Sequence, residues 1–283
     1  MAKLKTDIYV GIDGTGPEGF RTDIGVSPFG KKQRSNPGYG MEMQYVDIGS
    51  EESYAHQFVH SHVYHYWLNW HGLKKYYKRG PEFFGFSTEV RAKDAFDWLI
   101  EARKYSRGRI FLCGYSRGAY AVVRVAHMLK SLADKGDSEL NSSVHALMLF
   151  DAVQRTEDYP NLVNAYFWGY GNKVDADQSM SVIPDNVVNC CHLRRSPEGK
   201  SRQVMGNCST MLQDSRKTSY QERFFRGTHG SMGGIYYQPG PGQRAEDQVV
   251  EPGTGATNVT FRQDKTAAHE ARDEMDQFLY RVV

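Results

Sequence analysis

One serine stands between two glycines in the segment GYSRG, residues 114–118. The spacing of Gly114, Ser116 and Gly118 fits the G-x-S-x-G pattern, in which a serine occupies a tight turn between a strand and a helix. The glycines leave room for that turn, because a side chain at either position would collide with its neighbours. Backbone N–H groups at the start of the helix then lie beside the hydroxyl and stabilise developing negative charge. We therefore predict that Ser116 is a nucleophile and that the N–H of Arg117 is an oxyanion donor.

The flanking residues decide how much weight this motif carries, because the pattern alone occurs often by chance. The motif follows an apolar, strand-like run at residues 109–114 and opens a helical pattern at residues 117–133. A strand before the serine and a helix after it are the context that a nucleophile turn requires. The alternative is an inert serine in a glycine-flanked turn.

A serine nucleophile needs a base, and four histidines follow the motif outside its helix: His145, His192, His229 and His269. His229 fits best, because it follows a strand-like stretch and lies in the glycine-rich segment GTHGSMGG, which can bring an imidazole to the edge of a sheet. His145 opens a strand at its N-terminal end, His192 lies within a strand and His269 lies on the terminal helix.

The base in turn needs an orienting acid, and hydrolases of the α/β class place it between the serine and the histidine in the chain. Asp151 ends the apolar strand HALMLF, which puts its carboxylate at the edge of a parallel sheet where ligands bind. The alternative role for Asp151 is a helix N-cap. Asp185 and Glu198 are rival acids, since both lie close to the strand-like segment at residues 186–193.

Strands and helices alternate along the chain, as the positioning of these residues requires. Strands are expected at residues 7–13, 41–49, 109–114, 145–153, 186–193 and 222–227, and helices at residues 53–78, 87–105, 117–133 and about 265–280. This alternation predicts an α/β fold with a mostly parallel central sheet and helices on both faces. We expect one α/β-hydrolase domain over residues 1–283, with a glycine- and proline-rich surface loop at about 238–258.

Charge and hydropathy exclude several classes of protein. The formal net charge is +2, which is too small for a dedicated nucleic-acid binder, and the nearest basic patch, KKQR at residues 31–34, falls in an expected loop. No run of apolar residues is long enough for a transmembrane helix. The N-terminal residues run directly into a strand without an apolar signal segment. We expect a protein made in the cytoplasm that, if exported, leaves without a cleaved signal peptide.

The chain has four cysteines: Cys113, Cys190, Cys191 and Cys208. None of them is in a C-x-x-C spacing, which argues against a zinc site built on thiolates. We interpret them as reduced thiols.

Two further motifs have weaker chemical interpretations. The segment GTGPEG, residues 14–19, matches a dinucleotide-binding pattern but places a proline and a glutamate where a pyrophosphate would approach.

The histidine- and aromatic-rich segment HQFVHSHVYHYWLNWH contains His56 and His60 one helical turn apart, but no carboxylate to complete a metal site. We interpret this segment as an amphipathic helix that packs on the sheet. An alternative is that Tyr64, Trp67 and Trp70 face a substrate groove or a membrane surface, where aromatic rings are favourable.

Several segments together resemble one family, the α/β-hydrolase domain of type VI secretion phospholipase effectors of the first lipase-effector class. The matching segments occur in the family's order between residues 8 and 237: Asp13-Gly14-Thr15 after the first strand, GYSRGA at the turn, LMLFDAV as a strand that ends in a short aspartate motif, and FFRGTHGSMGG around the histidine. One departure is Ser231, which stands where the family has an acidic residue two positions after the histidine.

The resemblance implies a serine esterase of the lipase or phospholipase type, with Ser116, Asp151 and His229 as its catalytic residues and no metal or organic cofactor. It places the loop Asp13-Gly14-Thr15 beside the nucleophile, where the N–H of Gly14 or Thr15 would complete the oxyanion hole. It further implies an antibacterial secreted effector with a lipid ester substrate, a cognate immunity protein, a secretion-apparatus component and peripheral membrane contact. The alternatives are a non-catalytic binding module on a hydrolase fold, and a hydrolase of non-lipid acyl bonds.

Overall fold

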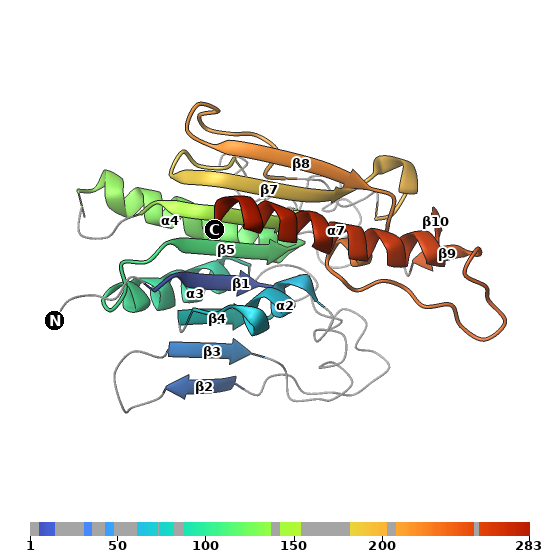
Figure 1. The fold of residues 1–283 in the computed structure, drawn as a ribbon, viewed down its shortest axis with the longest axis horizontal. Helices are drawn as coiled ribbons and strands as arrows, with labels where there is room; N and C mark the ends of the chain where they lie inside the picture. The colour runs from blue at the N-terminus through green and yellow to red at the C-terminus, as the bar shows by residue number, and fades with distance from the viewer. Residues whose placement is uncertain are drawn as a thin grey trace, which may run out of the picture.

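The structure is a computed structural model of the 283-residue chain, and it describes residues 6–14, 31–35, 43–47, 61–72, 74–81, 88–136, 142–153, 182–202, 208–251 and 255–283. Eight strands form one sheet in the order β2-β3-β4-β1-β5-β6-β7-β8. Their bounds are β1 Ile8–Ile12, β2 Lys31–Ser35, β3 Met43–Asp47, β4 Lys74–Lys78, β5 Ile110–Tyr115, β6 Val144–Phe150, β7 Val187–Arg195 and β8 Ser219–Phe225. All neighbouring strands are parallel except β2 and β3 (Figure 1).

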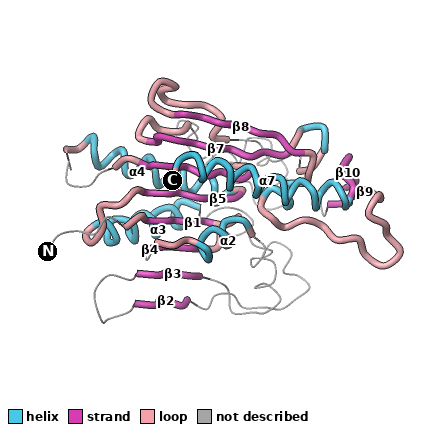
Figure 2. Tube along the Cα trace, viewed as in Figure 1, coloured by secondary structure: helices cyan, strands magenta, loops and turns pink. Residues whose placement is uncertain are grey.

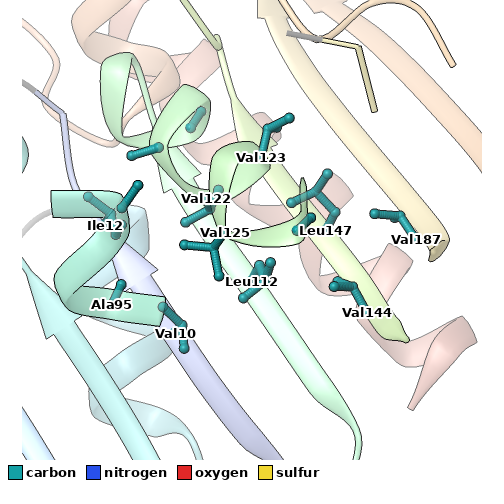
Figure 3. Packing of buried hydrophobic residues seen from close by; sticks show 14 of the residues in the cluster. Val10, Ile12, Ala95, Leu112, Val122, Val123, Val125, Val144, Leu147 and Val187 are labelled. Atoms are coloured by element: carbon teal, nitrogen blue, oxygen red, sulfur yellow. The ribbon is translucent and has the colours of Figure 1, made fainter. Parts of the chain in front are cut away.

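Helices cover both faces of this sheet, so the chain has the expected α/β architecture with a mostly parallel centre (Figure 2). On one face, α3 (Thr88–Arg103) and α4 (Arg117–Asp134) pack on apolar side chains of the central strands. Figure 3 shows Val10, Leu112 and Leu147 of three adjacent strands beneath Val122 and Val125 of α4. On the other face, α2 (His62–Asn69) and α7 (Phe261–Val282) cover a second, more aromatic core.

The central strands are continuous apolar runs because both of their faces are covered. Every residue of β1 and β5 is buried, as is typical of strands in parallel sheets. This burial explains why these strands show no alternation of polar and apolar residues. Because these strands pair parallel, the carboxyl ends of β1, β5, β6 and β7 lie at one edge of the sheet, where the candidate site lies.

The expected helix at residues 53–78 is wrong beyond Asn69. Helix α2 ends at Asn69, and Lys74–Lys78 form β4 between β1 and β3. Tyr76 packs in the core under α3 and α4, whereas Tyr77 packs in the aromatic core on the opposite face. This alternation is that of a strand, and the flanking lysines fold over neighbouring groups; the ammonium of Lys74, for example, donates to the carbonyl of Ala102 at 3.2 Å. Residues 48–60 lie outside the described part of the chain.

Two segments expected to be loops contain strands. Residues 31–34 belong to β2, the edge strand that pairs antiparallel with β3. Within the expected loop at about 238–258, β9 (Gln248–Glu251) pairs with β10 (Gly255–Thr260) in a small antiparallel sheet. The helix expected from about Lys265 begins earlier, at Phe261, because Thr260 forms a capping box with Gln263. None of the helices in the described part of the chain is long and apolar enough to cross a bilayer.

Candidate active site

Ser116 occupies the tight turn between β5 and α4. Its backbone has φ 56° and ψ −127°, a conformation that residues with a side chain seldom adopt. The two glycines allow the turn, because a Cβ at Gly118 would lie 2.1 Å from the carbonyl oxygen of Asp13 and a Cβ at Gly114 would lie 2.5 Å from the Cα of Ala119. The strain and the close packing together aim the hydroxyl at the edge of the sheet.

His229 brings its imidazole to this hydroxyl. Its Nε2 atom lies 2.8 Å from the Oγ of Ser116. His229 is the first residue of the short helix α6 (His229–Met232), which Thr228 caps. The backbone of His229 is held from two sides, because its N–H donates to the Oγ of Ser201 at 2.7 Å and its carbonyl accepts from the hydroxyl of Tyr115 at 3.0 Å.

Asp151 follows β6 and contacts the far side of the same imidazole. Its Oδ2 atom lies 2.6 Å from the Nδ1 of His229, and the side chain is fully buried. Like Ser116, Asp151 has a left-handed backbone, with φ 44°. Three residues that are distant in sequence thus form one hydrogen-bonded chain from hydroxyl to imidazole to carboxylate. An ionised Asp151 accepts from Nδ1–H and leaves Nε2 free to accept the proton of Ser116.

The rival acids lie elsewhere. Asp185 forms ion pairs with Lys130 and Lys217, at 3.0 Å and 2.6 Å. Glu198 is exposed on the short helix η3 (Pro197–Gly199). Neither carboxylate contacts His229 among the interactions of the described residues, so the geometry favours Asp151.

The other histidines also have local partners. The Nε2 of His145 lies 2.7 Å from the carbonyl oxygen of Val282, and His192 is buried, with its Nε2 accepting from the N–H of Ala152 at 3.0 Å. The ring of His269 lies beside that of Tyr236. By contrast, His229 is the histidine that the described structure brings to Ser116.

The electrostatic environment of Asp151 and His229 favours a neutral imidazole beside an ionised carboxylate. Burial alone would raise the pKa of Asp151, but the charge of Arg195 and the hydrogen bond from His229 hold it well below its usual range. Burial lowers the pKa of His229, and this effect outweighs the opposing influence of Asp151. Near neutral pH, His229 is therefore in the form that can accept a proton.

The loop after β1 lies directly beside Ser116. A Cβ added to Gly14 would lie 3.1 Å from the Cβ of Ser116. The N–H of Gly14 donates to the carboxylate of Asp13 at 2.9 Å, so this expected oxyanion donor is engaged with Asp13 in the structure. Arg117, the other described donor, is the first residue of α4, and Thr15 lies outside the described residues.

Asp13 is the centre of a buried polar cluster that the sequence did not indicate. Its carboxylate also accepts from the hydroxyl of Ser61 at 2.5 Å and from that of Tyr77 at 2.7 Å. Burial raises the pKa of Asp13 to about 6, against these hydrogen bonds and the charge of Arg79. The cluster ties the loop beside Ser116 to the start of α2 and to β4.

Arg195 is a second residue that sequence reasoning missed. This last residue of β7 forms a buried ion pair with Asp151, and its Nη1 lies 3.4 Å from the Nδ1 of His229. The only sequence signal is a basic residue that ends a buried strand next to the strand of the acid.

Two buried acidic residues support the segment that carries His229. Asp264 in the first turn of α7 accepts from the N–H groups of Thr228 and Tyr237, at 2.7 Å and 2.9 Å. Glu251 of β9 accepts from the hydroxyl of Ser201 at 2.8 Å. These contacts connect the small sheet and the C-terminal helix to the candidate site.

The other chemical interpretations find less support. The described residues contain no group of three or more ligand-type side chains suited to a metal ion, and His56 and His60 lie outside them. Trp67 is buried, and Tyr64 and Trp70 are partly buried against the aromatic core. Their packing agrees with a helix that covers the sheet. Most of the segment GTGPEG also lies outside the described residues.

None of the known protein-family models matches the chain, and no curated protein does. Among solved structures, the chain is similar at 13% identity and a TM-score of 0.44 to the Tle1 effector bound to the VgrG spike from the type VI secretion system. That match covers 84% of this chain and 52% of the other. An uncharacterized protein from Pseudomonas aeruginosa matches at 20% identity and a TM-score of 0.30, over 53% of this chain and 23% of its own. The chain thus spans about half and about a quarter of these two proteins.

Proposed function

We propose that this protein is a serine hydrolase that cleaves carboxylic esters. The observation that carries the proposal is the chain of contacts from Ser116 Oγ to His229 Nε2, at 2.8 Å, and from His229 Nδ1 to Asp151 Oδ2, at 2.6 Å. A strained serine turn with a buried imidazole and a carboxylate in hydrogen-bond contact is the arrangement used for nucleophilic acyl transfer.

The proposed reaction follows from these contacts. Ser116 attacks the ester carbonyl while His229 accepts its proton, and Asp151 stabilises the imidazolium that forms. The N–H of Arg117, at the positive end of α4, stabilises the oxyanion. The N–H of Gly14 or Thr15 is the second donor in this proposal, and for Gly14 it requires release of the hydrogen bond to Asp13. His229 then protonates the leaving alcohol, and water hydrolyses the acyl-enzyme by the same route in reverse.

The substrate and the biological setting are proposed from the sequence resemblance. We infer a lipid or phospholipid ester as the substrate, with peripheral contact to a membrane, and a single hydrolase domain over the chain. We also infer an antibacterial effector role with a secretion-apparatus component and an immunity protein as partners, and export from the producing cytoplasm without a cleaved signal peptide. The mechanism requires no metal or cofactor.

The proposal is tested by the purified protein and its Ser116→Ala variant. We expect labelling of Ser116 by a fluorophosphonate probe, and a loss of ester hydrolysis on the order of a thousandfold or more in the variant, with an unchanged fold by circular dichroism. Ester hydrolysis by Ser116→Ala at the rate of the unchanged protein would exclude the mechanism. If the unchanged protein neither reacts with the probe nor hydrolyses esters, a binding module is favoured. A panel of phospholipids and short-chain esters separates a lipase from a hydrolase of other acyl bonds.

A further inference from the structure

Asp151 is a buried carboxylate in hydrogen-bond contact with His229, whose imidazole is neutral in the resting site. Its side chain has no exposed surface, and burial lowers the pKa of the adjacent His229. A buried carboxylate beside a neutral imidazole is strongly disfavoured unless a cation compensates it. Without such a cation, the Asp151–His229 pair would take up a proton at a higher pH, and His229 would then not be free to accept the proton of Ser116.

Arg195 supplies this cation through its guanidinium group. Its Nη1 donates to Oδ2 of Asp151, the same oxygen that His229 contacts. The N–H of Arg195 also points to Oδ1 of Asp151 at 3.4 Å. The carboxylate is therefore held by strand β7 as well as by the imidazole.

The guanidinium itself is fixed, because backbone groups bind its other nitrogens. Its Nε donates to the carbonyl of Ser201 at 3.0 Å and its Nη2 to the carbonyl of Arg202 at 3.2 Å. The side chain is 7% exposed. Only a planar, forked cation can make these contacts together, so lysine would supply the charge without the geometry.

We propose that Arg195 is a positioning residue of the hydrolase: it keeps Asp151 ionised while His229 is neutral and so sets the pH above which His229 acts as a base. This inference depends on the proposed function for its catalytic consequence. Its electrostatic part concerns the Asp151–His229 pair alone and can be measured without turnover.

The charge of Arg195 acts among other groups that face His229 from each neighbouring element. These are Tyr115 on β5, Asp151 after β6, Arg202 after η3 and, through Ser201 and Thr228, Glu251 on β9 and Asp264 on α7. Asp151 raises the pKa of His229, whereas burial, Arg195 and Arg202 lower it. Arg202 has a carboxylate of its own within 3.8 Å, that of Glu251. Arg195, by contrast, shares its carboxylate with His229.

The experiment combines an NMR titration of the imidazoles with the pH dependence of kcat/KM. Signals of His229 are assigned by comparison with His229→Gln. In Arg195→Met we expect the His229 midpoint and the acidic limb of kcat/KM to rise together by about one pH unit or more, because a cation in contact is lost. In Arg195→Lys we expect both to stay close to their original values while kcat falls, because charge is kept and geometry is lost.

Arg194→Met is the matched control. Arg194 lies on the same strand and forms an ion pair with Glu222 at 2.6 Å, but adjacent strand residues point to opposite faces. We expect the His229 midpoint to be unchanged in this variant. Circular dichroism and thermal unfolding report whether each variant folds, and Arg195→Gln serves as the second neutral variant if methionine prevents folding.

The outcomes separate this inference from the proposed function. A folded Arg195→Met or Arg195→Gln protein with an unchanged or lowered His229 midpoint overturns the role of Arg195, whether or not the protein is active. If neither neutral variant folds, a raised midpoint in Arg195→Lys overturns it. A raised midpoint in a neutral variant of a protein that hydrolyses no ester supports the electrostatic role and counts against the hydrolase.

Discussion

Ser116 and Asp151 both have left-handed backbones, at φ 56° and φ 44°. Such conformations cost roughly 1–3 kcal/mol each, and they persist only where the surrounding structure holds them. For Ser116 the holding contacts include the hydrogen bond from its N–H to the carbonyl of Phe150 at 2.9 Å. For Asp151 they include its N–H bond to the carbonyl of Leu193 at 2.6 Å. Strain at two of the three residues in contact is what we expect of a site selected for chemistry rather than for stability.

The role of Asp151 is tested by the ranking of three conservative substitutions. Asp151→Asn should lower kcat by on the order of a thousandfold or more, because an amide that donates to Nδ1 stabilises the wrong imidazole tautomer. Asp185→Asn and Glu198→Gln should leave kcat within about twofold, since surface substitutions away from the site have small effects. Thermal unfolding of each variant shows whether loss of the Arg195 ion pair also destabilises the fold. An Asp151→Asn variant that hydrolyses esters as fast as Asp185→Asn and the unchanged protein would exclude Asp151 as the orienting acid.

At the scale of elements, the site depends on how closely α4 crosses β1. Gly118, in the first turn of α4, packs against the carbonyl oxygens of Ile12 and Asp13, at the end of β1. Gly80 makes the same kind of contact from the segment after β4, where a Cβ would lie 2.1 Å from the oxygen of Asp13. The loop beside Ser116 therefore lies between two glycines that pack closely on it, which fixes its distance from Ser116.

Gly118→Ala should disturb this crossing. Its Cβ would lie 2.2 Å from the oxygen of Ile12 and 2.1 Å from that of Asp13, so α4 and β1 must separate. We expect a loss of about 1–3 kcal/mol in the free energy of unfolding, measured in urea, and a larger proportional loss of ester hydrolysis. Gly136→Ala is the control, because at φ +87° it has no atom within 4 Å and meets backbone strain alone. A Gly118→Ala variant as stable and active as the unchanged protein would contradict the packing argument.

The elements that the sequence predicts well are those with a strong local pattern, either a continuous apolar run or apolar residues at helical spacing. The central strands are apolar runs bounded by glycine or charge, and α3 and α4 repeat apolar residues at helical spacing. Strand β4 was missed because KKYYK has only two adjacent aromatic residues between lysines and follows a helical pattern directly. Its strand character comes from pairing with β1 and β3, which are distant in sequence, so tertiary contacts override the local signal.

The whole molecule determines which candidate residues meet. Residue types and their positions at strand ends were enough to select Ser116, Asp151 and His229 for a common edge, because parallel strands place their carboxyl ends together. The side chains that hold these residues in place could not be predicted from the sequence. Asp13 and Arg195 act through contacts with residues 44 to 64 positions away, and such pairings are fixed by sheet order and helix placement rather than by a local motif.

The buried titratable groups also predict how the stability of the whole molecule depends on pH. Burial lowers the pKa of His62 to about 3 and that of His192 to about 4, from 6.5. Between about pH 6.5 and pH 4 the unfolded chain therefore binds more protons at these positions than the folded one. Each histidine then lowers the free energy of unfolding by about 1.4 kcal/mol per pH unit as the pH falls. Asp13, with its pKa raised to about 6, acts with the opposite sign below that pH and offsets one of them.

Urea unfolding at a series of pH values between 7.5 and 4.5 measures this dependence. The protein should lose stability on acidification, and below about pH 6 the slope should be close to that of one histidine, because the proton that Asp13 takes up in the folded protein offsets the other. His192→Gln should flatten the curve by one histidine's share, because an amide oxygen can still accept from the N–H of Ala152 but binds no proton. A free energy of unfolding that rises on acidification in this range would contradict the burial of these imidazoles. An unchanged slope in His192→Gln would show that His192 takes up a proton as easily in the folded protein as in the unfolded chain.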